Sequence, residues 1–95
     1  LNITVRVLNK EDIKSRKLPN QSTGLVITSI ANNSPLKNTS LSVDSIIVEA
    51  QKKRIKSVND LREITNQVLK SNQKTILLAI FNTQNQKRYI GVKLD

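Results

Sequence analysis

The residue types that most enzymes use for catalysis are scarce in this 95-residue sequence. It contains no histidine and no cysteine, so neither a Ser-His-Asp triad nor a zinc site with His or Cys ligands can be built from it. Two glycines are too few for a loop that cradles phosphate. Glu11 and Asp12 are adjacent acids, but residues at i and i+1 do not share a helix face. We therefore expect no catalytic residue, no metal site and no cofactor in this chain.

Binding is the remaining chemistry, and the charge of the chain suggests one form of it. Sixteen Lys and Arg against seven Asp and Glu give a net charge of +9, and four of the cations cluster at Lys52–Arg54 and Lys56. Such a patch could contact phosphates. Single-strand binders, however, stack bases on aromatic side chains, and this chain has two, Phe81 and Tyr89. The basic residues are also spread over every segment, as on a solvated surface. A nucleic-acid module is therefore the weakest alternative.

Five segments have the patterns of β-strands. Residues 1–8 alternate between apolar and polar side chains, which is the period of a half-buried strand with Ile3, Val5 and Val7 inward. The other four are short apolar and β-branched runs bounded by polar residues, at 24–30, 46–48, 75–81 and 88–94. The expected polar connections include a hairpin tip at 51–54 and a hairpin connection at 82–87.

Two short helices are expected from their capping residues. Asn9 is a good N-cap, and Asp12, three residues later, can complete a weak capping box for a helix of about two turns. Ser34 is the second N-cap, and Pro35 suits the first helical position. After this second helix, Leu41 is expected to return to the core.

A longer helix is expected after Ser57, where Asp60 lies near the positive end of the helix dipole, and it runs to about Lys70. The residues expected to face the core are spaced at i, i+3 and i+7, at Leu61, Ile64 and Val68. A second stripe on the adjacent face either borders solvent or lines a groove, and it consists of Val58, Arg62, Thr65 and Leu69.

The length and composition predict one small domain. Hydrophobic residues make up 37% of the chain, which is enough for a core without disulfides. The longest apolar run, Ile76–Phe81, is six residues, far short of the ~20 needed to cross a bilayer. Because the sequence starts at Leu1 rather than Met, we expect it to be a fragment of a larger protein.

The order of elements and a few spaced residues carry a resemblance. Gly24 opens a hydrophobic strand, Ser34-Pro35 makes a turn, Leu41 precedes the pair Asp44-Ser45, and Ser57–Leu61 reads Ser-x-x-Asp-Leu. This pattern resembles the PDZ domains of HtrA (Do-type) serine proteases, most of all their second, C-terminal PDZ domain. The resemblance implies a PDZ-like α+β fold over residues 1–95, a small, partly open antiparallel β-barrel or sandwich. It would have five to six strands in the bacterial, permuted order and two to three flanking helices.

Several positions depart from the family pattern. Asn2 stands in the carboxylate-binding loop where the family has glycine, although asparagine tolerates left-handed backbone better than most residues. Asp44 stands at a second glycine and Ser45 at an aspartate, where its hydroxyl can still bond nearby backbone. The run Tyr89–Val92 imitates a carboxylate loop, but it lies inside the last strand pattern, and we interpret it as coincidence.

The resemblance implies recognition by β-augmentation, in which an extended or C-terminal peptide adds a strand to an exposed sheet edge. The edge would be residues 3–8, and backbone amides near the start of the chain would hold a terminal carboxylate. The implied peptide-binding residues are Leu1, Asn2, Ile3, Thr4 and Val5 on the strand, and Val58, Arg62, Thr65 and Leu69 on the helix.

The resemblance also implies a setting. The chain would be a regulatory domain of a periplasmic, trypsin-like serine endopeptidase of protein quality control, with the catalytic triad in a preceding domain. Its partners would be C-terminal or unfolded polypeptide segments and other domains or subunits of the protease, without specific nucleic acid or membrane insertion. The main alternative is a scaffold that joins protease trimers and binds no free peptide, which Asn2 slightly favours. The peptide preference and the size of the assembly stay open.

Overall fold

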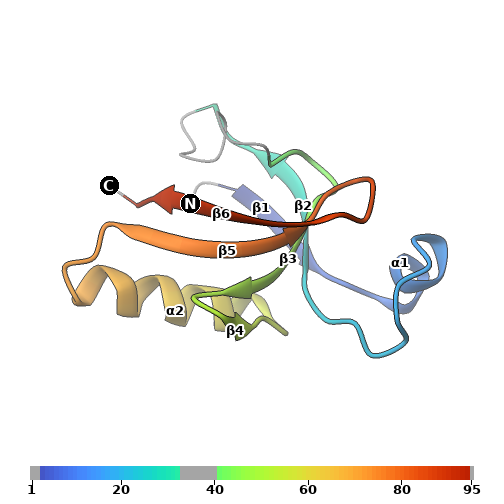
Figure 1. Cartoon of the computed structure of the whole chain (residues 1–95), viewed down its shortest axis with the longest axis horizontal. Helices are drawn as coiled ribbons and strands as arrows, with labels where there is room; N and C mark the ends of the chain where they lie inside the picture. Colours follow the sequence, from blue (N-terminus) through green and yellow to red (C-terminus); the bar gives the residue numbers. More distant parts are fainter. Residues whose placement is uncertain (1–2, 33–40, 95) are drawn as a thin grey trace.

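A computed structural model describes residues 3–32 and 41–94 of the chain. All strand pairs are antiparallel and belong to one sheet of order β1-β2-β3-β5-β6, with β4 paired to β3 (Figure 1). The described residues thus form a small α+β unit, an open six-stranded sheet and two helices. The elements are β1 (Ile3–Val7), α1 (Lys10–Ser15), β2 (Leu25–Ile30), β3 (Ile46–Ala50), β4 (Lys53–Arg54), α2 (Val58–Lys70), β5 (Thr75–Phe81) and β6 (Lys87–Lys93).

The main core lies between α2 and the sheet. Figure 1 shows α2 running below β5, and it contacts both β1 and β5. The three residues of α2 predicted to face the core, Leu61, Ile64 and Val68, are all buried, which confirms that stripe. Leu41 is also buried in this cluster, as expected. The buried strand residues that α2 covers include Leu25, Ile27, Ile47, Ile76, Leu78 and Ile80.

A second, smaller cluster lies next to α1 and contains Leu8, Val26 and Ile46, with Ile13 and Leu18 packed against it. This second cluster explains why the prediction for Val7 was wrong. Val7 was expected to face the core, but it is 50% exposed, and Leu8 is buried instead. Because β1 ends at Val7 and the chain then turns into α1, the strand alternation stops one residue before this cluster.

Both described helices begin with complete capping boxes. In α1 the Asn9 side chain accepts from the Asp12 backbone N–H at 2.9 Å, and the Asp12 carboxylate accepts from the Asn9 N–H at 2.9 Å. In α2 the same reciprocal pair forms between Ser57 and Asp60, at 3.2 and 3.1 Å. These boxes confirm both N-termini. The helix predicted at Ser34 and Pro35 lies outside the described residues.

The structure explains the residue types at three positions of the family pattern, Gly24, Asp44 and Ser45. A Cβ on Gly24 would lie 2.7 Å from Ile46 Cγ2 and 2.8 Å from the Ile47 carbonyl oxygen, so a side chain there would push β2 away from β3. Asp44 has a φ of 76°, as expected where the family has glycine. Ser45 is fully buried, and its hydroxyl accepts from the Ser42 N–H at 3.4 Å.

The hairpin predicted at 51–54 has a shorter tip than expected. Gln51 and Lys52 form a two-residue turn, both with positive φ (52° and 67°), as a type I′ turn requires. The next two residues, Lys53–Arg54, already pair with β3 as β4. The run Tyr89–Val92 pairs with β5 within β6, so it is a strand and not a loop.

Candidate functional site

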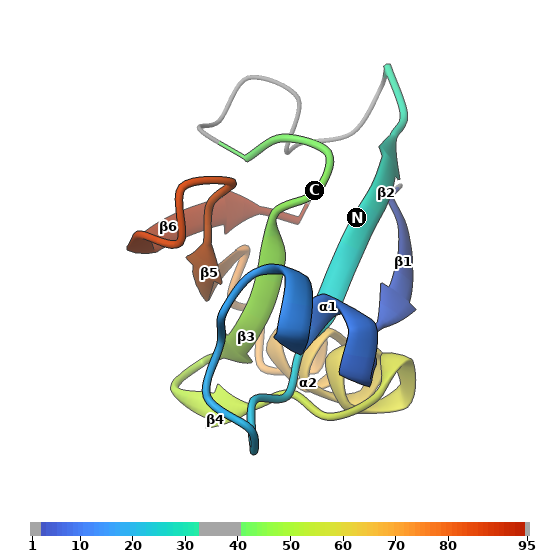
Figure 2. The same cartoon turned by 90° about the vertical axis from the view of Figure 1, so that its right-hand side faces the viewer.

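The strand β1 stands at one end of the sheet and pairs with β2 alone among the described strands (Figure 2). The Leu8 N–H donates to the Gly24 carbonyl at 3.0 Å, and the Thr4 carbonyl accepts from the Thr28 hydroxyl at 3.1 Å. The main-chain groups of Thr4 and Leu8 therefore point toward β2. Because these groups alternate in direction along a strand, the intervening ones point to the open edge. They belong to Ile3, Val5 and Val7.

A β-bulge shapes this edge. Thr4 pairs with Ser29 and Val5 with Ile27, so Thr28 is an extra residue in β2. A bulge increases the local twist of a strand pair, and here the Thr28 hydroxyl bonds to the Thr4 carbonyl at the irregular point. The sequence contained no signal for the bulge, because Thr28 fits a strand as well as its neighbours do.

The helix α2 turns its second stripe toward β1. On its other flank, Asp60, Glu63 and Gln67 line a hollow shared with residues 53–56 at β4. Since residues on a helix advance by about 100° each, Val58, Arg62, Thr65 and Leu69 lie on the flank away from β4. The half-buried side chains of Ile3 and Val5 pack against the core cluster that α2 covers. We call Ile3, Val5, Val58, Arg62, Thr65 and Leu69 the β1–α2 face. Thr4, also predicted to bind peptide, is exposed, and its side chain lies on the opposite side of the strand from Ile3 and Val5.

The β1–α2 face presents apolar groups to solvent. Val58 is 37% and Leu69 49% exposed, and Arg62 is exposed between them on the same stripe. The Thr65 hydroxyl donates to the Leu61 carbonyl at 2.8 Å, so this half-buried side chain offers its methyl group and acceptor lone pairs. Of the predicted strand residues, the structure thus places Ile3 and Val5, but not Thr4, on the side that α2 covers. Leu1 and Asn2, predicted to form the carboxylate loop, lie outside the described residues.

The basic cluster at β4 is not a uniform cationic patch. Lys53, Arg54 and Lys56 share their hollow with Asp60 and Glu63 of α2. Interspersed carboxylates lower the positive potential that a phosphate backbone would meet. The geometry therefore adds no support to the nucleic-acid alternative.

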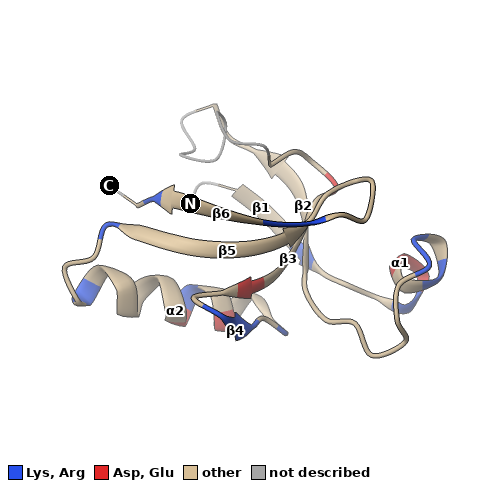
Figure 3. Ribbon diagram, viewed as in Figure 1, with Lys and Arg blue, Asp and Glu red and all other residues tan. Residues whose placement is uncertain are grey.

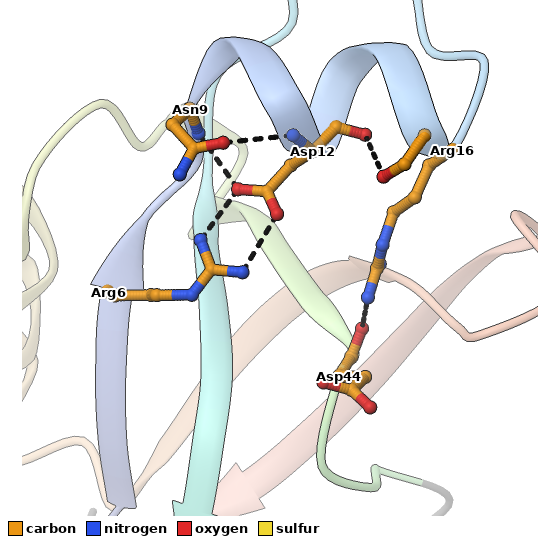
Figure 4. A network of polar contacts seen from close by, with 6 residues as sticks. Arg6, Asn9, Asp12, Arg16 and Asp44 are labelled. Carbon is orange, nitrogen blue, oxygen red and sulfur yellow. Dashed lines mark hydrogen bonds and ion pairs between the residues drawn. The ribbon is translucent and has the colours of Figure 1, made fainter.

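A polar network fixes α1 to the sheet (Figure 4). Arg6 donates to both carboxylate oxygens of Asp12, at 2.6 and 2.8 Å, while Asp12 also closes the capping box with Asn9. The hydrogen bonds from Arg6 and from the Asn9 N–H lower the pKa of Asp12 to about 2, although burial of the carboxylate acts in the opposite direction. The hydrogen bond between Arg6 and Asp12 also raises the pKa of Arg6.

The C-terminal end of α1 is tied down as well. Arg16 donates to the Asp44 carbonyl (Figure 4). The Asn85 side-chain amide donates to the Arg16 carbonyl at 2.7 Å. The sequence could not predict these contacts, because Arg16 and Asn85 are 69 residues apart. The network holds α1 at one end of the molecule, beyond the sheet (Figure 1).

The described residues offer neither a metal site nor a membrane-spanning helix. Within 3–32 and 41–94, no three acidic side chains gather in a way that could hold a metal ion. Neither described helix is long and apolar enough to span a membrane.

Comparisons with known proteins bear on the fold. No protein-family model and no curated protein matches the chain. It is similar to a solved structure described as "HtrA-type protease AlgW with decapeptide", with a TM-score of 0.70 and 20% sequence identity over 98% of this chain. The match covers 27% of that protein, so this chain spans about a quarter of its length. At this identity the likeness to the HtrA-type protease structure shows the fold alone. It confirms the α+β, PDZ-like fold expected from the sequence.

Proposed function

We propose that the chain is a PDZ-type, peptide-binding domain of an HtrA-type serine protease and takes an extended peptide as an added strand along β1. The observation that carries this proposal is the outer edge of β1, which no other strand of the described residues covers and which lies beside the exposed apolar side chains of α2. The similar HtrA-type protease structure contains a decapeptide, which supports a peptide as the ligand here.

The expected affinity follows from the few groups involved. Each main-chain hydrogen bond contributes about 1 kcal/mol net. One buried apolar side chain of the peptide adds roughly 1.5–3 kcal/mol. Ordering the peptide opposes much of this gain, so dissociation constants in the micromolar to millimolar range are expected.

The side chains of the β1–α2 face also suggest which peptide sequences would bind best. Val58 and Leu69 offer apolar contacts at two ends of the stripe, and the exposed guanidinium of Arg62 lies between them. Peptides with an apolar end and an acidic residue upstream should therefore bind best. If backbone amides around Leu1 to Ile3 hold a terminal carboxylate, amidation of the peptide end weakens binding.

The physiological setting of this proposal rests on the sequence resemblance. The domain would regulate a periplasmic, trypsin-like endopeptidase by binding C-terminal or unfolded segments. The chain itself lacks histidine, so the triad would belong to another part of the protease.

The test is an NMR titration with a ten-residue peptide that has an apolar C-terminus. Val5 is the central residue of the open edge, and Val5→Pro removes its outward N–H, which an edge strand tolerates. Val5→Ala is the matched control, because it loses similar packing but keeps the N–H. Circular dichroism checks that both variants fold.

The proposal predicts shifts at residues 3–8 and 58–69, weaker binding by Val5→Pro and near-normal binding by Val5→Ala. Equal loss in the two variants would mean that packing rather than the edge matters. Shifts centred on residues 52–56 would contradict the proposal outright.

The scaffold alternative would use the other edge of the sheet. Within the described sheet β6 pairs with β5 alone, so it is open as well. It carries Lys87, Arg88 and Lys93, however, and charged residues on an edge oppose strand pairing between copies. This difference between the two edges favours the peptide-binding role.

A further inference from the structure

The exposed side of α1 carries a regular pattern of lysines that the proposed peptide site does not use. Lys10, Ile13, Lys14 and Lys17 are spaced at i, i+3, i+4 and i+7, which places them on one side of the helix and the turn that follows. Of the two acids of α1, Asp12 bonds to Arg6, and Glu11 neighbours Lys14 at i, i+3. Figure 3 shows the blue of these cations along α1 and its turn.

The turn after α1 brings Lys17 and Leu18 back to this side. The Leu18 N–H donates to the Ile13 carbonyl at 2.9 Å, and the Lys17 N–H donates to the Lys14 carbonyl at 3.3 Å. With Lys17 in the left-handed region (φ 56°), this is a Schellman motif. Such a motif brings its first and last side chains together, here Ile13 and Leu18, and both are half-buried above the Leu8 cluster.

A hollow of about 460 Å³ opens at this place. Its floor is apolar and consists of Ile13 and Leu18. Its polar lining consists of three lysines, Lys10, Lys14 and Lys17, and the neutral Asn20. Among the residues that the structure describes, no carboxylate lines it. The volume lies within the roughly 300–1,000 Å³ typical of ligand sites. We call these six residues the α1 hollow.

We propose that the α1 hollow binds an acidic polypeptide segment that inserts one apolar side chain between the three lysines. The lysines complement carboxylates on either side of the inserted residue, and the half-buried Ile13 and Leu18 contact it. A membrane surface fits less well, because the two apolar side chains form a floor and do not protrude into a bilayer. A nucleic acid fits less well, because the hollow has no aromatic side chain for a base to stack on.

The α1 hollow and the β1–α2 face share no residue, although one anchor of α1, Arg6, lies in β1. The Arg6–Asp12 ion pair and the Asn85–Arg16 hydrogen bond hold the two ends of α1. The two surfaces can therefore be occupied separately, and this proposal stands or falls without the proposed peptide function.

The probe is a short peptide with one leucine between pairs of glutamates, acetylated and amidated so that it has no terminal carboxylate for the β1 edge. NMR titration at about 50 mM salt should show saturable shifts at Lys10–Asn20, with a dissociation constant in the submillimolar range. Replacing the leucine of the probe by serine should weaken binding severalfold.

Two double variants, one in the α1 hollow and one at the β4 hairpin, each remove two positive charges, and the second is the control for the first. Lys10→Gln with Lys14→Gln should weaken binding about fivefold or more, since exposed ion pairs each contribute a factor of about two to five at low salt. Lys52→Gln with Lys53→Gln should leave it unchanged. Lys17→Gly should weaken binding while the fold stays intact, because glycine suits the backbone there.

Three results would overturn the proposal. Equal weakening by the two double variants would mean that the probe senses the net charge of +9 and not the hollow. No saturable shift at millimolar probe would show that the hollow does not bind acidic peptide. Shifts at α1 with anionic lipid vesicles but none with the probe would assign the surface to a membrane.

Discussion

The two described helices flank the same sheet and begin with the same capping box, yet they are held to it by different forces. α2 is anchored by three buried side chains, Leu61, Ile64 and Val68, whereas α1 has no buried residue. Besides the half-buried Ile13, which packs on the Leu8 cluster, α1 depends on the Arg6–Asp12 ion pair and on hydrogen bonds at Arg16. Apolar burial is insensitive to salt and pH, while ion pairs respond to both. The position of α1 should therefore depend on solution conditions, and that of α2 should not.

The largest effect is expected from weakening the apolar anchor. Ile64→Ala removes a buried side chain at the centre of α2 and should lower the free energy of unfolding by about 2–4 kcal/mol. Asn66→Ala, on the exposed side of the same helix, is the control and should change it by less than about 0.5 kcal/mol. Urea denaturation measures both. A cost below 1 kcal/mol for Ile64→Ala would show that packing does not anchor α2.

A smaller effect is expected from the polar anchor. Asp12→Asn removes the carboxylate that accepts from Arg6 and should cost about 1 kcal/mol after solvent screening, with Glu11→Gln as the matched control. The pKa of Asp12 is about 2 in the folded protein, below its value of about 3.9 in an unfolded chain. The stabilisation is thus fully present above about pH 4 and lost as the pH falls toward 2.

The measurement is stability as a function of pH. The wild type should lose more stability than Asp12→Asn between about pH 4 and pH 2. Parallel curves for the two proteins would contradict a role for this carboxylate in holding α1.

A third prediction concerns the turn that ends α1, where a glycine should stabilise the protein. Lys17 is in the left-handed region, where a non-glycine residue is strained, so Lys17→Gly should raise stability by about 0.5 kcal/mol. Lys14→Gly, inside the helix, should lower it by about 1 kcal/mol. Thermal unfolding of the two variants should give shifts of opposite sign. Two shifts of the same sign would mean that the turn after α1 lacks this geometry.

The smallest effect on stability is expected at the exposed stripe of α2. Leu69→Ala should change the free energy of unfolding by no more than about 0.5 kcal/mol, because the side chain is half exposed. It should still weaken binding of an apolar-ended peptide severalfold. Titration calorimetry beside denaturation separates the two effects, and unchanged binding would remove Leu69 from the β1–α2 face.

Local patterns predicted most of the fold. The capping residues Asn9 and Ser57 gave both described helix starts, and the i, i+3, i+7 spacing gave the buried face of α2, because these signals lie within one or two turns of chain. The fold class needed the joint spacing of Gly24, Asp44 and Ser57. Val7 was misplaced because burial at the end of β1 is decided by the turn into α1, not by strand period.

The candidate site was predicted less completely. The helical spacing predicted which residues of α2 share the exposed stripe, but not the Thr28 bulge or the hydrogen bond of the Thr65 hydroxyl, which depend on neighbouring chain. The predicted roles of Leu1 and Asn2 stay predictions. The α1 hollow had a local signal, the spacing of Lys10, Lys14 and Lys17, but its apolar floor depends on a left-handed turn at a lysine that the sequence does not mark.

Amide hydrogen exchange along β1 tests the central claim most directly, that this strand offers an open edge to a peptide. In the free protein the Arg6 and Leu8 amides, which face β2, should exchange slowly, and the Val5 and Val7 amides should exchange fast. A saturating apolar-ended peptide should slow Val5 and Val7 and leave Arg6 and Leu8 unchanged. If Val5 and Val7 are already protected in the free protein, or stay unprotected with saturating peptide, β1 does not accept an added strand.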